Sequence, residues 1–410
     1  MNTKSLLSFD NTEYAFAYKK NAELKKAAFL FASMGKPWLI KLGLAITPRA
    51  IKWNFPFTKI IIRKTIFRQF VGGETLEETA PVAGRLHQFN VQVILDYGVE
   101  GGDDGEDSFD SSTEEFIRVI NYAGTQPNIP FISIKVTGFS RFLLLEKIDA
   151  LMHEAAGTLM KRYLKAIENL NEPEKEEWHR VRVRMLRICE AAAEKKIGVL
   201  VDAEETWIQD PVDALTILMM DTFNKNRTVV FNTMQLYRHD RLQFLKDSHE
   251  AAAERNFILG AKLVRGAYME KERQRAIDKG YPSPIQPNKN ACDADYNAAV
   301  IFCIERLDKI SLIVASHNEY SNLLATQHMQ QKNTAFNHAH VHFSQLYGMS
   351  DNITFNLAKA GCSVSKYLPF GPIKDVIPYL MRRAQENSSV AGQTGRELGL
   401  IKKELKRRKL

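Results

Sequence analysis

Two adjacent arginines near the C-terminal end of the chain, Arg382 and Arg383, are the residues best suited to bind an anion. On a helix they project from neighbouring faces, and Glu386 follows them by four and three residues, so its carboxylate can reach both guanidinium groups. Guanidinium groups bind carboxylates through paired hydrogen bonds. The pattern predicts a carboxylate receptor, although pairs of this kind more often decorate a solvated helix face.

The residues around the arginine pair favour the receptor. Tyr379 lies one helical turn before Arg383, and Pro378 is placed in the first turn of the expected helix, where its missing N–H costs nothing. The preceding residues, 366–372, are expected to form the end of a strand that turns into this helix. Aromatic side chains beside a carboxylate-binding pair at such a junction indicate a small amphipathic acid as the ligand.

Polar residues also follow several short apolar segments that are expected to be strands. They are Lys135, Asp202, Gln235 and His317. In a parallel barrel, the carboxyl ends of the strands carry the chemistry. Each residue alone has an ordinary explanation, such as a helix N-cap for Asp202 or solvent exposure for Lys135. Four residues at equivalent positions favour a site.

The segment 261–269, Ala-Lys-Leu-Val-Arg-Gly-Ala-Tyr-Met, is the second strong feature. Gly266 and Ala267 after a strand allow the backbone to approach a ligand closely. Lys262 and Arg265 provide charge for a phosphate or an electron-rich ring. No Gly-x-Gly-x-x-Gly fingerprint of a dinucleotide-binding fold was found in the chain.

Three histidines, His338, His340 and His342, recur at every second residue of an expected strand. Side chains on one face of a strand are about 6.5–7 Å apart, and such histidines can bind zinc when a partner ligand helps. No carboxylate or cysteine accompanies them nearby in the sequence. They are therefore expected to line the barrel or its outer face, and no metal site is predicted.

An alternation of short apolar segments and helix-like segments begins near residue 91. The expected strands are 91–96, 130–136, 197–202, 228–232, 258–264, 312–316, 335–343 and 362–368. The segments 142–170, 173–196 and 241–255 carry good helix formers. Repeated strand-then-helix units predict an α/β fold, a (β/α)8 TIM-like barrel. The expected organisation is an N-terminal helical arm over residues 1–85, the barrel over 86–395, and a basic, solvated C-terminal tail over 396–410.

Composition places the chain among folded globular proteins, with 45% apolar and 25% charged residues. The net charge of +8 is compatible with nucleic acid, an anionic membrane surface or an anionic ligand. Nucleic acid is not expected, because no basic groove interleaved with aromatic residues occurs. The four cysteines lack disulfide or zinc spacing, which fits a reducing compartment. We saw no targeting peptide or membrane-spanning run, so the expected location is cytoplasmic, with peripheral contact to the inner face of the membrane as an option.

The chain from about residue 91 to residue 387 resembles the proline dehydrogenases, in particular their monofunctional, eukaryote-like branch. The Tyr-Leu-Pro-Phe-Gly turn at 367–371 and the Arg-Arg-x-x-Glu-Asn helix carry the resemblance at its C-terminal end. The landmarks before them occur in family order: Ser-Ile-Lys at 133–135, Asp-Ala-Glu-Glu at 202–205, Gln-Leu-Tyr at 235–237, Lys-Leu-Val-Arg-Gly-Ala-Tyr at 262–268, an expected loop at 289–293, Ser-His-Asn at 316–318 and Phe-Ser-Gln-Leu-Tyr-Gly-Met at 343–349. Many bacterial members carry arginine at the position of Lys262 and threonine at that of Ser316.

The resemblance implies a flavoenzyme that oxidises L-proline to 1-pyrroline-5-carboxylate, with hydride passing from proline C5 to N5 of FAD and electrons passing on to a quinone at a membrane surface. It implies that the substrate is held by Lys135, Leu263, Tyr268, Tyr367, Tyr379, Arg382, Arg383 and Glu386. It implies that FAD is bound by Asp202, Ala203, Gln235, Lys262, Arg265, Gly266, Ala267, Lys289, Ser316 and His317. Asp202 and Lys262 would lie nearest the reactive edge of the flavin and are the expected catalytic residues. No separate protein partner is evident in the sequence.

Three alternatives to proline oxidation stay open on the sequence. Hydroxyproline is the second substrate within the family, and a tyrosine at the position of Tyr367 goes with proline there. Lysines 135 and 262 are also compatible with a Schiff-base lyase on a barrel scaffold. A non-catalytic carboxylate-binding protein would keep the arginine pair without binding a flavin.

Overall fold

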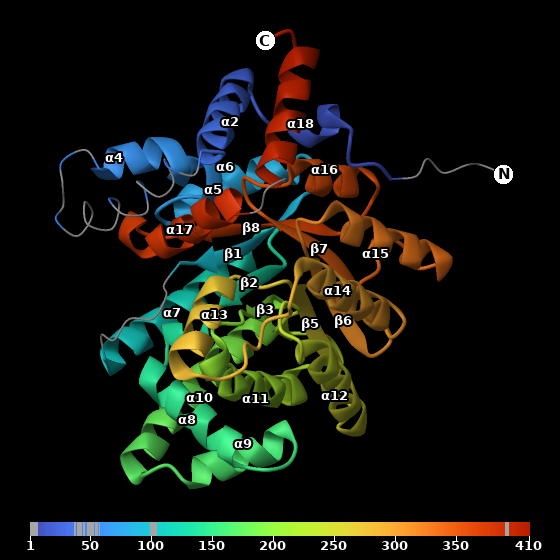
Figure 1. Cartoon of the computed structure of the whole chain (residues 1–410). Helices are drawn as coiled ribbons and strands as arrows, with labels where there is room; N and C mark the ends of the chain where they lie inside the picture. The colour runs from blue at the N-terminus through green and yellow to red at the C-terminus, as the bar shows by residue number, and fades with distance from the viewer. Residues whose placement is uncertain are drawn as a thin grey trace. The chain divides into compact units, whose positions relative to one another are not determined.

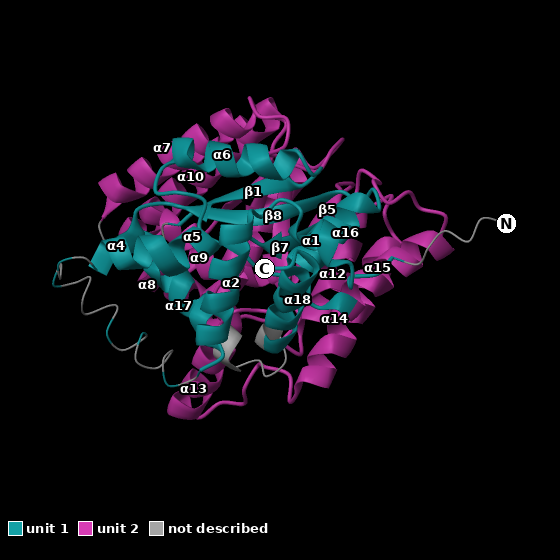
Figure 2. Cartoon of the chain, turned by 90° about the horizontal axis from the view of Figure 1, so that it is seen from above, with its two compact units in different colours: residues 1–98, 317–319, 343–410 teal, residues 99–316, 320–342 magenta. Residues whose placement is uncertain are grey.

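The computed structural model describes residues 7–36, 38, 43, 46, 53, 56, 58–98, 105–389 and 393–410, without the side chains of residues 386–389, 393 and 394. Strands β1 to β8 follow one another in a closed barrel, and the neighbouring pairs whose register is described run parallel. The contacts divide the chain into two compact units, unit 1 (residues 1–98, 317–319 and 343–410) and unit 2 (residues 99–316 and 320–342), shown in Figure 2. The predicted α/β barrel is thereby confirmed.

The eight strands fall close to the segments expected from the sequence, with one exception. They are β1 (Gln92–Tyr97), β2 (Phe131–Ile134), β3 (Gly198–Val201), β4 (Val230–Gln235), β5 (Leu259–Val264), β6 (Ile310–Ala315), β7 (Val341–Leu346) and β8 (Val364–Phe370). The expected seventh strand, 335–343, is largely wrong. Residues 335–340 form turns, closed by hydrogen bonds from the His338 N–H to the Ala335 carbonyl and from the Val341 N–H to the His338 carbonyl.

Unit 2 contains β2 to β6 and most of the helices between β1 and β7 (Figure 1). These helices are α7 (Glu106–Ala123), α8 (Phe142–Glu154), α9 (Leu159–Glu168), α10 (Glu172–Lys195), α11 (Thr206–Phe223), α12 (Arg241–Glu254), α13 (Met269–Lys279), α14 (Lys289–Ile304) and α15 (Glu319–Gln331). The expected single helix over 142–170 is two helices. Gly157 has φ +115°, and the hydroxyl of Thr158 accepts a hydrogen bond from the Lys161 N–H, which starts α9 as a new helix.

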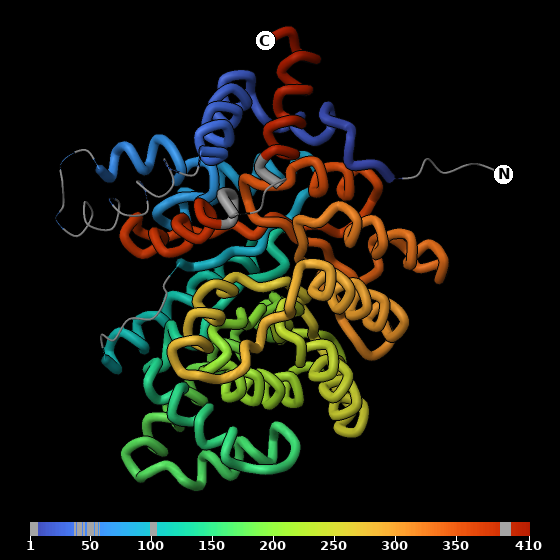
Figure 3. The backbone as a smooth tube through the Cα atoms, viewed as in Figure 1, coloured from blue at the N-terminus to red at the C-terminus, as the bar shows by residue number. Residues whose placement is uncertain are grey.

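Unit 1 contains β1, β7, β8 and helices from both ends of the chain. They are α1 (Thr12–Phe16), α2 (Asn21–Met34), α4 (Thr58–Ile62), a π-helical turn (Arg63–Phe67), α5 (Arg68–Phe70), α6 (Leu76–His87), α16 (Asp351–Lys359), α17 (Ile373–Ser389) and α18 (Gln393–Arg407). Figure 3 shows the blue N-terminal helices beside the red C-terminal helix. The guanidinium of Arg408 makes this contact, since it donates to the carbonyls of Phe16 and Lys19.

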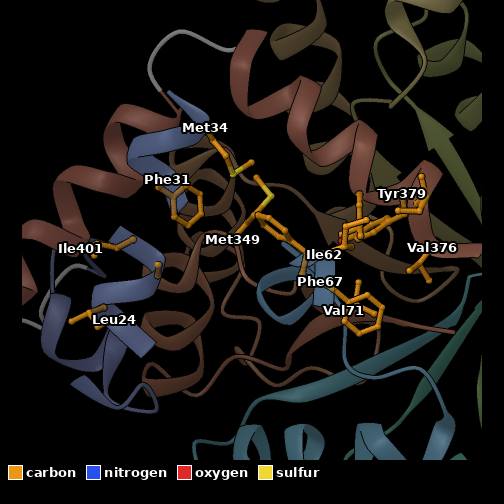
Figure 4. Close-up of a cluster of buried hydrophobic side chains, with 14 of the residues drawn as sticks. Leu24, Phe31, Met34, Ile62, Phe67, Val71, Met349, Val376, Tyr379 and Ile401 are labelled. Atoms are coloured by element: carbon orange, nitrogen blue, oxygen red, sulfur yellow. The ribbon is translucent and has the colours of Figure 1, made fainter. Parts of the chain in front are cut away.

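An apolar cluster holds the helices of unit 1 together (Figure 4). Its buried side chains come from α1, α2, residues 62–71, Met349, α17 and α18. Phe31 and Phe70 meet edge to face with ring centroids 6.4 Å apart. The sequence placed residues 1–85 in a separate helical arm. The helices are confirmed where the structure describes them, and the domain boundary at residue 85 stays a prediction.

Two details of the C-terminal helices differ from expectation. Helix α17 begins at Ile373, after Pro372, so Pro378 lies inside the helix and not in its first turn. The basic side chains at 402, 403, 406 and 407 are exposed as predicted, but they belong to α18, whose other face is buried. Leu400, Ile401 and Glu404 are buried, because this helix packs on α1 and α2 and the Glu404 carboxylate accepts hydrogen bonds from Arg407 and Arg408. Among the residues that the structure describes, each helix is too short or too polar to cross a lipid bilayer.

Candidate active site

A buried ion pair lies at the carboxyl ends of two strands of unit 2. The ammonium of Lys262, in β5, contacts the carboxylate of Asp202, which directly follows β3. The Lys262 side chain is 6% exposed and that of Asp202 13%. Asp202 is not a helix N-cap, since α11 starts at Thr206. A buried ion pair seldom stabilises a fold more than apolar packing would, so this pair is better explained by chemistry at this position.

Two uncharged polar side chains of β4 lie next to the ion pair. Thr233 is the register partner of Lys262, and Gln235 comes two residues later on the same face of the strand. Both are buried, and among the described residues neither the Thr233 hydroxyl nor the Gln235 carbonyl oxygen has a hydrogen-bond partner. Buried polar atoms are rarely left unsatisfied, so these two atoms indicate a missing ligand or water.

Arg265 lies just beyond β5, and hydrogen bonds to three side chains fix its guanidinium group. It donates to Asp293 at 2.8 Å, to the hydroxyl of Ser316 at 2.8 Å and to that of Ser321 at 3.0 Å. The guanidinium carbon also lies 4.3 Å from the centre of the Tyr296 ring. Arg265 and Ser316, both predicted cofactor ligands, are thus brought together.

Lys289 joins this cluster through its ion pair with Asp293. Burial opposes it, but the hydrogen bonds from Lys289 and Arg265 hold the pKa of the Asp293 carboxyl below its ordinary value. The prediction of a loop at 289–293 is wrong. These residues are the first turn of α14, capped by Asn288, whose side chain accepts from the Ala291 N–H. Lys289 is therefore exposed at a helix N-terminus.

Position 266 in the 261–269 segment requires a glycine, both for its backbone conformation and because of the nearby Tyr237 ring. Gly266 has φ +137°, and a Cβ atom there would overlap the ring of Tyr237. Ala267, which follows, is exposed, and Tyr268 directly precedes α13. Leu263 is fully buried in β5, in register with Met234 and Val314. Its contact with a substrate stays a prediction.

Lys135 and Glu204 are both more buried than the sequence indicated. Lys135 is buried, so the solvated interpretation of this lysine is wrong. Glu204, which the sequence did not single out as a site residue, accepts a 2.6 Å hydrogen bond from the Thr137 hydroxyl. Burial raises the pKa of the Glu204 carboxyl to about 7, against the opposing effects of Thr137 and of the Lys135 charge. Ala203, beside it, is partly exposed. The Asp-Ala-Glu-Glu motif contains Glu204, but the motif by itself does not show that this carboxyl is buried.

The arginine pair lies in α17 of unit 1. Arg383 is 6% exposed and its guanidinium carbon stands 5.2 Å from the centre of the Tyr379 ring, as the one-turn spacing predicted. Arg382 is more exposed than Arg383. The side chain of Glu386 is outside the described part of α17, so its proposed contact with both arginines stays a prediction. A buried, stacked arginine is not part of a solvated helix face.

Tyr367 and His317 are the two other predicted site residues of unit 1. Tyr367 is buried in the interior of β8 and not at its end, with Ile94 and Leu346 as register partners. His317 directly follows the Ser316 position after β6. Its Nδ1 atom lies 2.8 Å from the hydroxyl of Ser350, a residue that the sequence reasoning did not include.

Of the three histidines, His338 and His340 lie together, with ring centroids 5.7 Å apart. His342 is buried against Phe131 in unit 2, where burial lowers its pKa to about 3. His340 Nδ1 lies 2.6 Å from the Leu307 carbonyl oxygen, and His338 is in a turn. Their expected common strand face is wrong, because β7 starts only at Val341.

The donor set of unit 2 fits a flavin dinucleotide. Lys262, Arg265 and Lys289 provide positive charge for phosphates and for ring carbonyls, and Gln235 provides an amide whose oxygen has no partner among the described residues. Glu204 adds a carboxyl group whose pKa burial raises, and Asp202 adds a carboxylate that is paired with Lys262. The fold and these residues define a parallel α/β barrel with a set of paired charged and polar residues near its strand ends.

Comparison with known proteins gives the family. The model of the proline dehydrogenase family matches residues 80–396. Mitochondrial proline dehydrogenase 1 of Caenorhabditis elegans is 29% identical over 98% of this chain and 88% of its own length. Hydroxyproline dehydrogenase of Xenopus laevis is 30% identical over 96% of this chain and 88% of its own length. The chain therefore belongs to the proline dehydrogenase family, oxidoreductases that act on proline.

A solved structure agrees on the fold. Proline utilization A from Bdellovibrio bacteriovorus, inactivated by N-propargylglycine, superposes with a TM-score of 0.70 at 19% identity, over 95% of this chain and 40% of that protein. At this identity the likeness concerns the fold. The chain spans less than half of that larger protein.

Proposed function

We propose that this protein binds FAD noncovalently and oxidises L-proline to 1-pyrroline-5-carboxylate. The observation that carries this proposal is the set of polar groups on or just after neighbouring strands, Asp202, Thr233, Gln235 and Lys262. The Thr233 hydroxyl and the Gln235 carbonyl oxygen in this set lack hydrogen-bond partners among the described residues. Bound FAD would supply a two-electron acceptor that takes hydride from proline C5 at flavin N5. Membership of the proline dehydrogenase family supports the same chemistry.

In this proposal the residues of unit 2 bind and tune the flavin. Lys262 and Asp202 would meet its reactive edge, where the lysine charge stabilises the electron-rich reduced form and the aspartate fixes the lysine rotamer. Arg265 and Lys289 would neutralise phosphate or ring oxygens, and Gln235 and Ser316 would hydrogen-bond to polar edges. Ala203, Gly266 and Ala267 carry little or no side chain, so they would let the backbone approach the cofactor.

The substrate would be recognised through its carboxylate and its apolar ring. Arg382 and Arg383 would bind the carboxylate, with Lys135 as a third cation and Glu386 orienting the arginines. Tyr379 would help to hold the Arg383 guanidinium, whose carbon lies 5.2 Å from the centre of the tyrosine ring. Tyr367, Tyr268 and Leu263 would wall the ring and exclude water. Electrons would leave to a quinone at a membrane surface.

The test is proline-dependent reduction of a soluble quinone analogue by the purified protein, with the product identified as 1-pyrroline-5-carboxylate. Turnover with proline would support the proposal. Turnover with hydroxyproline at a higher kcat/KM would move the assignment to that substrate, for which the similarity to the Xenopus laevis hydroxyproline dehydrogenase gives a specific reason. A protein that forms an imine between a lysine and a ketone, without redox chemistry, would be a Schiff-base lyase instead.

A further inference from the structure

His317 is held by a chain of contacts that ends in the C-terminal helix. Its Nδ1 lies 2.8 Å from the Ser350 hydroxyl, and the Ser350 N–H donates to the Glu397 carboxylate in α18 at 3.1 Å. Ser350 has φ +50°, a left-handed conformation that costs energy for a serine. The surroundings must stabilise this conformation, and the Glu397 contact is one of the interactions that do so.

The residue before Glu397 holds the other end of the same segment. The Arg396 guanidinium donates to the carboxylate of Glu319 at 2.9 Å. Asn352, in the first turn of α16, donates to the same carboxylate at 2.9 Å. Two consecutive residues of α18 therefore secure the segment 317–319 at both ends, Glu397 through Ser350 and Arg396 through Glu319 directly.

The loop that carries Ser350 has little freedom to move by itself. The Gly348 carbonyl accepts a 2.7 Å hydrogen bond from Gln69, and the Met349 carbonyl accepts one from the ammonium of Lys366. Lys366 is fully buried and also forms a 2.9 Å ion pair with Asp351, the first residue of α16. Ser350 is thus held by contacts on both sides of it in the chain, and the contact to Glu397 is the one that comes from α18.

Glu397 is itself a buried carboxyl that the proposed reaction does not use. Its side chain is removed from water, and burial together with the charge of Asp351 raises its pKa to about 7. The Ser350 N–H can donate to Glu397 whether the carboxyl is protonated or ionised, because a carboxyl oxygen accepts a hydrogen bond in both forms. Burial of a carboxyl is costly and calls for a specific use of this kind.

We infer that the start of α18 is a positioning element for the cofactor site, in which Arg396 and Glu397 fix the segment 317–319 so that the His317 ring keeps one orientation toward the flavin. This inference rests on the proposed function and on the FAD contact that the family resemblance implies for His317. Neither Arg396 nor Glu397 touches the cofactor in this account. Their loss would weaken FAD retention while leaving the Asp202–Lys262 pair in unit 2 unchanged.

The experiment measures the rate at which the purified holoprotein releases FAD after dilution, followed by the fluorescence of free flavin. Arg396→Met is expected to release FAD about 10-fold faster, which corresponds to the loss of one modest polar interaction. Asp10→Asn is the matched control. It removes the other ion pair of the same arginine, in which Arg396 lies 2.6 Å from Asp10, and leaves the Glu319 contact in place. Release from this control is expected to stay within about 2-fold of wild type.

A second pair of variants separates positioning from general loss of folding. Glu397→Gln keeps an acceptor for the Ser350 N–H and should retain FAD and the wild-type flavin absorption bands, whereas Glu397→Leu should release FAD faster and shift those bands. Glu319→Gln should behave like Arg396→Met, and the double variant should be no worse than either single one. Equal release by Arg396→Met and Asp10→Asn, or by the two Glu397 variants, overturns the inference. A wild-type protein that binds no FAD overturns the proposed function first, so the two failures are distinguishable.

Discussion

Replacing Arg383 with methionine tests the carboxylate receptor. The arginine is 6% exposed and stacked on Tyr379, so its guanidinium is largely shielded from water that could replace a lost contact. Methionine keeps an unbranched apolar side chain and removes the charged fork. A charge-assisted contact in such surroundings contributes about 2–4 kcal/mol, which corresponds to a roughly 30- to 900-fold weaker affinity for proline.

The assay is the proline concentration that half-saturates bleaching of the flavin under anaerobic conditions, with thermal unfolding as the folding check. Lys374→Met is the matched control, because it removes one positive charge from the same helix at a side chain that is 73% exposed. Arg383→Lys should fall between the two, since it keeps the charge and loses the planar fork. Proline affinity of Arg383→Met within 2-fold of the Lys374→Met control would refute the receptor.

Two further predictions concern specificity and pH. Tyr367→Ser should narrow the preference for proline over hydroxyproline by about 1–3 kcal/mol, because it opens space and offers a hydroxyl group to the hydroxyl group of hydroxyproline. The measurement is kcat/KM for both substrates in wild type and variant. An unchanged ratio of the two values would show that Tyr367 does not wall the substrate. Glu204 has a folded-state pKa of about 7 against an ordinary 4.5, so its stabilising contribution is complete at low pH and is lost as pH rises through 7. Urea titrations at pH 5.5 and 8.5 should show wild type losing about 2 kcal/mol of unfolding free energy relative to Glu204→Gln, and equal loss in both proteins would contradict the buried carboxyl.

The barrel could be predicted from the sequence because its strands are short apolar runs, a pattern that burial on both faces imposes on parallel strands. Strand β7 was misplaced for a physical reason. The residues before it, including His338 and His340, alternate with apolar or small side chains as a strand would, but local hydrogen bonds close them into turns. Pro378 was misplaced because a second proline, Pro372, precedes the helix, and sequence alone does not say which one starts it.

The site residues named from the sequence are those with charge or a motif. The structure brings Asp202 to Lys262 and Arg265 to Ser316, four residues that the resemblance implies to lie around the cofactor. Ser350 and Glu397 lie in no motif that was singled out, and Glu204 was included only as part of the Asp-Ala-Glu-Glu motif. They act through contacts between segments far apart in the chain, such as the one from residue 350 to residue 397, and single serines and glutamates carry no signal of burial.

The central claim is that this chain holds FAD and passes electrons from proline to it. The most direct measurement is the visible absorption spectrum of the purified protein, reconstituted with FAD if necessary and titrated with L-proline in the absence of oxygen. The account predicts a flavin spectrum that proline bleaches and that a quinone acceptor restores. A colourless protein that cannot be reconstituted with FAD, or a flavin whose spectrum proline leaves unchanged, would contradict it.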